Sequence, residues 1–286
     1  MKKITLLLFI SFISCGKSEF KITEPVTEQT PPPPAPINQH TNAKIIAIKQ
    51  LNGAIMFNKL TYTLNDKLLP ASLNYYDSVS NTLDYMVQFN YKNDTIRVNN
   101  NEWLLMAPGT NNVLKHFIRT TYADNTFDDE LYTYTYDNSN RLIKKRIYVN
   151  GAVKEDYYSD YAYDGNNLIS CKLMLASTNQ LIQESKIKYN TSQQIKPWVY
   201  LFGDAFENNI YLPVLNYGVK PSNTVSSIIT DIYDVTAGKK IDTWSSSFSG
   251  YVISKDNFVL QVTTNGDRQQ GLGIYLGTMR FDYQTY

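Results

Sequence analysis

Apolar and polar residues alternate with a period of two along much of this chain from residue 43 onward. Successive side chains of a β-strand point to opposite faces of a sheet, so this alternation predicts strands with one buried and one solvated face. The clearest runs are Leu60, Tyr62 and Leu64; Tyr132, Tyr134 and Tyr136; and Ile143, Ile147 and Val149, which alternate with Lys144, Arg146 and Tyr148.

Short segments rich in Asn, Asp and Gly separate these runs, and such segments are typical of turns. Asn150-Gly151 is the strongest of these signals, because both residue types tolerate the positive φ that a type I′ hairpin turn requires. Strands and turns recur at short spacing, which favours consecutive antiparallel hairpins over βαβ units. We therefore expect an all-β fold, with one large antiparallel β-meander over residues 43–286 whose sheet is open, curved or a half-barrel.

One region departs from this pattern. Between Pro197 and Pro221 the aromatic residues do not alternate, and Phe202, Phe206 and Ile210 follow the i, i+4, i+8 spacing of a helix. The sequence predicts a short helical insertion near 198–216. We expect its apolar side chains to pack beneath the sheet, and the alternative is that they line a ligand pocket.

A weak internal repeat accompanies the turns. Residues 133–143 are echoed by residues 160–169, which places Tyr136 and Tyr163 at equivalent positions, each directly before an Asp that begins a turn. The chain has 23 tyrosines in 286 residues, and tyrosine favours strands. Cross-strand aromatic packing is the favoured interpretation of the repeat. The alternative is a tyrosine ladder on which a carbohydrate stacks.

The N-terminus has the pattern of an export signal. Lys2 and Lys3 precede an apolar run that ends at Ile13, and this run is too short to span a bilayer as a helix. Ser14 followed by Cys15 resembles the lipobox of bacterial lipoproteins, although Phe12 stands where that motif usually has Leu. The resemblance implies that signal peptide 1–14 is removed and that Cys15 is lipidated, with acyl chains such as palmitate. The alternative is an ordinary signal peptide with an incidental cysteine.

Residues 15–42 would then connect the lipid to the folded domain. They show no apolar periodicity and contain six prolines, four of them consecutive at positions 31–34. Consecutive prolines favour an extended polyproline II conformation, which acts as a semi-rigid spacer. We therefore predict a disordered, proline-rich tether, and a proline-recognising partner is the competing interpretation.

Charge and cysteine content exclude several functions. With 27 basic and 26 acidic side chains, no large field attracts nucleic acid, so none is expected as a partner. If Cys15 carries lipid, Cys171 has no disulfide partner, and its alternating neighbours Ile169 and Leu173 predict a buried thiol. A nucleophilic cysteine needs a histidine, and the chain has only His40, in the tether, and His116.

Acidic residues offer little chemistry. Asp124, Asp128, Asp129 and Glu130 cluster on a predicted turn, but their order does not match an EF-hand loop, which favours an exposed acidic turn over a Ca²⁺ site. Glu155 and Asp156 are adjacent on a predicted strand and so point to opposite faces, which excludes a glycosidase pair. We predict no catalytic residue, no metal and no cofactor.

The signal ending in Cys15, the Tyr-x-Tyr-Asp turns and the segment from Leu201 to Leu215 resemble a family of uncharacterised envelope lipoproteins of Bacteroidetes-type bacteria. The family is a domain of unknown function with a porin-like or open β-meander fold. The turns also resemble the YD repeats of Rhs-type secreted proteins. The resemblance implies a fold and an envelope location but no catalytic residue, and Gly16 after Cys15 favours the outer membrane.

Two functions are consistent with these observations. The first is a non-enzymatic lipoprotein, attached to the membrane through its N-terminal lipid, with a structural role or a binding role toward a glycan, a peptide or an envelope protein. The second is a hydrolase of envelope or nutrient polymers whose acidic residues meet only in the fold.

Overall fold

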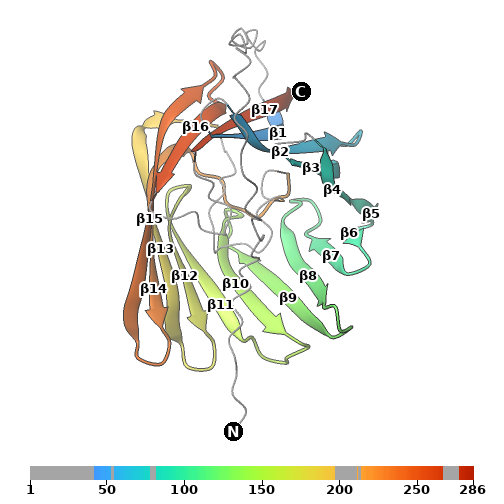
Figure 1. Cartoon of the computed structure of the whole chain (residues 1–286), viewed down its shortest axis with the longest axis vertical. Coiled ribbons are helices and arrows are strands. Elements are labelled where there is room, and N and C mark those ends of the chain that lie inside the picture. Colours follow the sequence, from blue (N-terminus) through green and yellow to red (C-terminus); the bar gives the residue numbers. More distant parts are fainter. Residues whose placement is uncertain (1–41, 53–54, 78–81, 197–210, 212–213, 267–276) are drawn as a thin grey trace, which may run out of the picture. The chain divides into compact units, whose positions relative to one another are not determined.

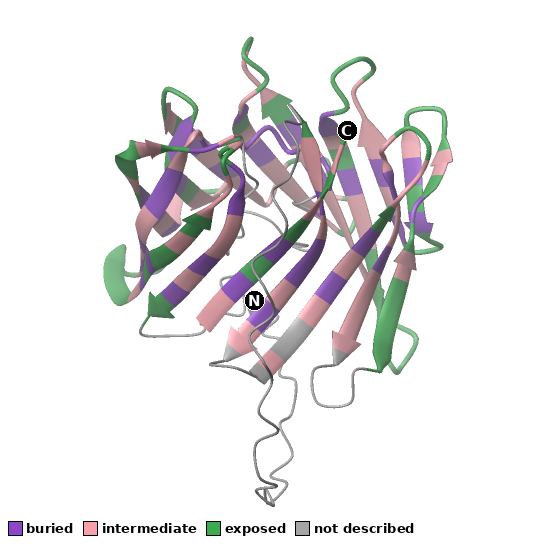
Figure 2. Ribbon diagram, turned by 90° about the horizontal axis from the view of Figure 1, so that it is seen from above, coloured by how far each residue is buried: buried purple, intermediate pink, exposed green. Residues whose placement is uncertain are grey.

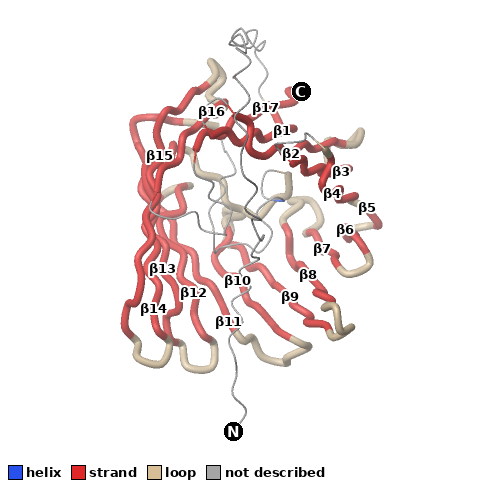
Figure 3. Tube along the Cα trace, in the orientation of Figure 1, coloured by secondary structure: helices blue, strands red, loops and turns tan. Residues whose placement is uncertain are grey.

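The computed structural model describes residues 42–52, 55–77, 82–196, 211, 214–266 and 277–286. Seventeen β-strands are present in this part of the chain (Figure 1). Their bounds are β1 Ala43–Asn52, β2 Ile55–Leu64, β3 Pro70–Asp77, β4 Leu83–Gln88, β5 Asn90–Lys92, β6 Thr95–Asn99, β7 Glu102–Met106, β8 Val113–Thr121, β9 Phe127–Tyr136, β10 Leu142–Val149, β11 Tyr157–Asp164, β12 Asn167–Leu175, β13 Gln180–Gln194, β14 Asn223–Asp234, β15 Lys239–Ile253, β16 Val259–Gly266 and β17 Gly277–Thr285. The all-β prediction is confirmed (Figure 3).

The strands form a meander that closes on itself. From β1 to β4 and from β5 to β17, each strand pairs antiparallel with the next in the sequence, and β17 pairs with β1. Phe89 lies at the corner between β4 and β5, and its amide donates to the carbonyl of Ala71 at 2.9 Å. The corner allows β4 to follow β3 while β5 turns to pair with β6. The predicted meander is therefore a nearly closed ring.

The inner face of the ring carries the core. Directly opposed residues on antiparallel strands share a face, and the row Tyr161, Cys171, Ser185 and Thr230 is buried across four successive strands. Figure 2 shows the resulting bands of buried and exposed residues alternating along the strands. The expected burial of the Cys171 thiol is confirmed.

Two expected inward positions are wrong, and β-bulges explain both. Ile143 and Ile169 are 38% and 39% exposed, whereas the preceding residues, Leu142 and Leu168, are fully buried. On β10 the register shifts between Leu142 and Lys144, so Ile143 is the extra residue. On β12 it shifts between Leu168 and Ser170, so Ile169 is the extra residue. One extra residue on a strand reverses which face the following side chains occupy, so simple alternation fails at these points.

Turn chemistry closes the hairpins as the sequence indicates. The Asp137 carboxylate accepts hydrogen bonds from the amides of Ser139 and Arg141, both at 2.9 Å, and Asn140 adopts a φ of 58°. Asn150 and Gly151 both have positive φ, which confirms the predicted turn. The connection continues to β11 at Tyr157, so it is longer than a two-residue hairpin.

The segment expected to be helical lies mostly in 197–210 and 212–213, outside the described residues. At its end, the amides of Val214 and Leu215 donate to the carbonyl of Tyr211, which makes a single turn. We call Tyr211 together with residues 214–222 the inner segment, because Tyr211, Leu215 and Tyr217 are buried against the core of the ring. The described part of this segment therefore packs beneath the sheet, as expected.

Candidate functional site

A buried polar cluster joins the inner segment to strands β7 and β8. His116 Nε2 lies 2.7 Å from Glu102 Oε1, and the Tyr211 hydroxyl donates to Glu102 Oε2 at 3.2 Å. His116 is only 1% exposed, and its ring centroid lies 6.1 Å from that of Tyr211. This arrangement could hold or pass a proton, but its burial denies access to a polymeric substrate.

The cluster extends across the inner face to the next two strands. The Tyr132 hydroxyl donates to Glu130 Oε2, and Tyr132 also packs against the His116 ring. Lys145, 1% exposed, holds its ammonium 5.6 Å from the centroid of the Tyr132 ring. Sequence reasoning missed Glu102 and Lys145 because charged residues are usually solvated. The available signal for Lys145 was its position between Ile143 and Ile147, in phase with apolar residues.

A second interior feature is a set of tyrosine hydroxyls that tie hairpins together, which we call the tyrosine clasps. Each hydroxyl donates to a backbone carbonyl within the first three residues of an earlier strand. The pairs are Tyr91 with Pro70, Tyr136 with Val113, Tyr189 with Leu168, Tyr251 with Val225, and Tyr283 with Val259, at 2.5–2.9 Å. Burial raises the pKa of Tyr136 and of Tyr189, so both hydroxyls stay protonated as donors.

Tyr163 is the residue of the repeat equivalent to Tyr136, but its hydroxyl does not form the same hydrogen bond. The Tyr163 hydroxyl is buried, and it neither donates nor accepts a hydrogen bond within the described part of the chain. The Arg141 guanidinium instead lies 5.1 Å from the centroid of the Tyr163 ring. Both tyrosines are partly buried and pack against the core, which supports the packing interpretation of the repeat over an exposed ladder for carbohydrate.

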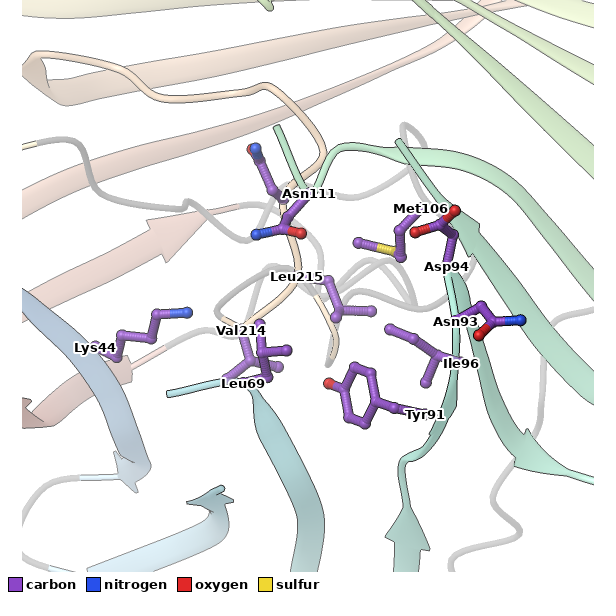
Figure 4. Close-up of a pocket in the computed structure, with 11 residues that line it drawn as sticks. Lys44, Leu69, Tyr91, Asn93, Asp94, Ile96, Met106, Asn111, Val214 and Leu215 are labelled. Atoms are coloured by element: carbon purple, nitrogen blue, oxygen red, sulfur yellow. The ribbon is translucent and has the colours of Figure 1, made fainter. Parts of the chain in front are cut away.

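A cavity of about 130 Å³ opens beside the inner segment (Figure 4). It lies against β5, β6 and β7, and Lys44 of β1 reaches it from the other side. Its polar groups include Lys44 and Asp94, and its apolar wall consists of Leu69, Tyr91, Ile96, Met106, Val214 and Leu215. The inner segment thus fills both roles considered from the sequence, since it packs beneath the sheet and lines a pocket.

The remaining sequence candidates do not assemble a site. Cys15 and His40 lie outside the described residues. Cys171 is on β12 and His116 is on β8, and these strands are not neighbours, so they form no cysteine–histidine pair. Glu155 approaches Arg146 at 3.9 Å, whereas Asp156 accepts from the amide of Val149, so the two acids have different partners.

The predicted acidic turn is only partly correct, because Asp124 lies in the turn before β9 whereas Asp128, Asp129 and Glu130 lie on β9 itself. Protein donors hold the carboxylates of Asp128 and Asp129. Asp128 accepts from the Tyr122 hydroxyl at 2.7 Å, and Asp129 forms two hydrogen bonds with Arg119 at 2.6 and 2.7 Å. The bond to Asp128 raises the pKa of Tyr122 to about 12, and these same partners lower the pKa of both carboxyls. Glu130 is directed to Tyr132 instead. In the described part of the chain, no group of three acidic, His or Cys side chains is arranged to hold a metal.

Two solved structures are similar to this chain over most of its length. A porin-like protein from Bacteroides uniformis ATCC 8492 is 10% identical, with a TM-score of 0.55 over 86% of this chain and 99% of that one. A porin-like protein from Bacteroides vulgatus ATCC 8482 is 12% identical, with a TM-score of 0.52 over 85% and 99%. At these identities the likeness shows the fold alone. No family model matches the chain, and no curated protein is significantly similar to it.

The fold is therefore a nearly closed, porin-like antiparallel meander, and the predicted porin-like architecture is confirmed. Within the described residues, no helix has the length and apolar character needed to cross a membrane. Lipidation at Cys15 and the likeness to YD repeats stay predictions.

Proposed function

We propose that this protein is a non-enzymatic envelope lipoprotein, held at the outer membrane by Cys15, whose ring of strands stands in water and has a binding role. The observation that carries the proposal is the chemistry of the outer face. Ser185 and Ile187 are buried on β13, so the alternating Glu184 and Lys186 point outward.

Ion pairs link neighbouring strands on this outer face around much of the ring. They join β1 to β17, β8 to β9, β10 to β11, and each successive pair of strands from β12 to β15. The pairs are Lys49–Asp282 at 2.8 Å, Arg119–Asp129 at 2.6 Å, Lys144–Asp160 at 3.1 Å, Lys172–Glu184 at 3.5 Å, Lys186–Asp231 at 3.8 Å and Lys240–Asp231 at 3.2 Å.

Such a face is unsuited to lipid. A strand that spans a membrane presents apolar side chains to the hydrocarbon, and each lysine or arginine placed at the midplane costs about 2–4 kcal/mol. The charged face is instead suited to water, which makes an N-terminal lipid the means of attachment. The likeness of fold to porin-like structures therefore does not imply a pore formed by this chain.

The interior favours binding over catalysis. The Glu102–His116 pair is buried against Tyr211, and the two acids Glu155 and Asp156 have different partners. The small cavity beside the inner segment is the concave feature best suited to a ligand.

The attachment is tested by replacing the one sulfur on which it depends. Full-length Cys15→Ser, expressed in a host that processes lipoproteins, is expected to leave the membrane fraction and to enter the aqueous phase after detergent phase separation. Cys171→Ser is the matched control, because it changes the other cysteine, which is buried in the ring. It is expected to stay with the membrane and to incorporate a palmitate analogue.

Two results would contradict the proposal. The first is a folded Cys15→Ser protein that resists extraction from membranes by alkaline carbonate, because the strands themselves would then be inserted. The second is stepwise ion conductance of the purified chain in a planar lipid bilayer, because that would require a membrane-spanning pore.

A further inference from the structure

The cavity beside the inner segment has a cation and an anion on opposite sides of an apolar wall. Figure 4 shows the Lys44 ammonium directed toward Val214 from one side, while the Asp94 carboxylate lies beyond Leu215 on the other. Among the described residues, no carboxylate lies within ion-pair distance of Lys44. Lys49, five residues further along β1, is paired with Asp282 on the outer face.

The electrostatic situation of Lys44 is therefore unusual for this protein. Partial burial lowers the pKa of Lys44, and the nearby ammonium of Lys220 lowers it further. Desolvation and a like charge both disfavour the protonated amine, and no acidic partner among the described residues offsets them. A bound anion would supply a counter-charge for the Lys44 ammonium. The apolar wall of the cavity would then contact the rest of the bound molecule.

We propose that this cavity binds a small organic carboxylate, with its carboxylate at Lys44 and its apolar body against Tyr91, Ile96 and Leu215. This inference rests on the binding role proposed above and specifies the class of ligand. The volume of about 130 Å³ is close to that of an apolar cavity that accepts benzene, about 150 Å³. Asp94 repels a carboxylate at the far side, so it orients the ligand toward Lys44.

The wall composition distinguishes this ligand from a glycan. Asn93, Asn111 and Asn216 also line the cavity, but the wall that includes Leu69, Met106 and Val214 offers no hydrogen-bonding side chain to the hydroxyl groups of a sugar ring. A sugar ring placed against this apolar wall would lose the hydration of the hydroxyl groups on that side without replacement, which is unfavourable. An aliphatic or aryl carboxylate of about the size of benzoate meets both the apolar wall and the cation.

The test compares benzoate with benzamide, which has the same ring and shape but no charge. Both are titrated against the full-length chain in nanodiscs of zwitterionic lipid, with binding followed by saturation-transfer NMR and isothermal calorimetry. We expect saturable binding of benzoate, about tenfold or more tighter than that of benzamide, because only the carboxylate forms an ion pair with the Lys44 ammonium, whereas the amide is a neutral acceptor.

Three variants locate the interaction. Lys44→Met should remove the preference for benzoate, Lys44→Arg should retain most of it, and Lys49→Met, a change on the same strand but the outer face, should leave it unchanged. Thermal melting of each variant confirms that it is folded.

Equal affinities for benzoate and benzamide, no saturable binding of benzoate, or a preference for benzoate that survives in folded Lys44→Met would each overturn the proposal. The binding measurements do not depend on how the chain is attached to the nanodisc. A negative result therefore leaves the assignment of the lipid anchor standing, and a failed Cys15→Ser test leaves the ligand assignment standing.

Discussion

The tyrosine clasps permit a test in which two equivalent positions should respond differently to the same small change. Replacing Tyr136 with Phe removes only the hydroxyl that donates to the carbonyl of Val113. Replacing Tyr163 with Phe removes a hydroxyl that is buried without a hydrogen bond in the described part of the chain. The two substitutions delete the same atom at equivalent places in the repeat.

The expected magnitudes follow from the partners. A typical hydrogen bond contributes about 0.5–1.5 kcal/mol, and a buried acceptor that loses its donor adds a desolvation penalty, so Tyr136→Phe should destabilise the fold by about 1–2 kcal/mol. Tyr163→Phe removes an unsatisfied polar group, so its effect should be within about 0.5 kcal/mol of zero or stabilising. For a domain of this size, the loss at Tyr136 corresponds to a melting temperature lower by about 2–8 °C.

Thermal melting followed by circular dichroism, with the full-length chain in one detergent, provides the measurement, and urea unfolding gives the free-energy difference. Tyr136→Ala and Tyr163→Ala extend the series, and both should cost on the order of 2–4 kcal/mol because each leaves a cavity. Equal effects of the two Phe variants would refute the role of the clasp. Unchanged melting of both Ala variants, with loss of binding to an envelope polysaccharide, would restore the carbohydrate ladder.

Two further predictions concern the inner segment and the outer face. Gly218→Ala should destabilise the fold by several kcal/mol more than Gly109→Ala. Both glycines have positive φ, but only at Gly218 would the new Cβ lie 2.6 Å from a backbone oxygen, that of Asn140. Equal losses of stability in urea unfolding would contradict this prediction. The hydrogen bond from Thr243, followed by neighbouring ammonium groups, lowers the pKa of Asp231, so its contribution to stability is present above about pH 4 and is lost as the pH falls through the lowered pKa. Asp231→Asn should therefore be less stable at pH 7 and show a shallower loss of stability between about pH 4 and pH 2, and an unchanged pH slope would argue against the pairing.

Local patterns predicted the strands and their order, because period-two alternation and Asx/Gly turns are properties of neighbouring residues. Asp137 shows how directly this works, since its side chain closes the turn that its position in the sequence indicated. The same local reasoning failed at Ile143 and Ile169, because a bulge is decided by pairing with the next strand. Each bulge moved an isoleucine to the outer face, where alternation would not have placed it.

The candidate site was less accessible to sequence reasoning. Glu102, His116 and Tyr211 are far apart in the chain, and only closure of the ring around the inner segment brings them together. The cavity depends on the same enclosure, because Lys44 belongs to the first strand and Asp94 to the turn before the sixth. Alternation places Lys44 and Lys49, five residues apart, on opposite faces of a strand. It does not predict that Lys44 reaches a cavity while Lys49 forms a surface ion pair.

The pairing of the first strand with the last has a consequence for the order of folding. β1 can pair with β2 early, but its other edge has no partner until β17 has been synthesised. Bringing together the two ends of so long a segment costs about 5 kcal/mol of chain entropy, which nearest-neighbour hairpins avoid. The nearest-neighbour hairpins should therefore form first, with the β1–β17 seam as the last step. Until that seam forms, the outer edges of β1 and β17 are open to pairing with other chains, so slow synthesis or loss of β17 exposes this protein to aggregation.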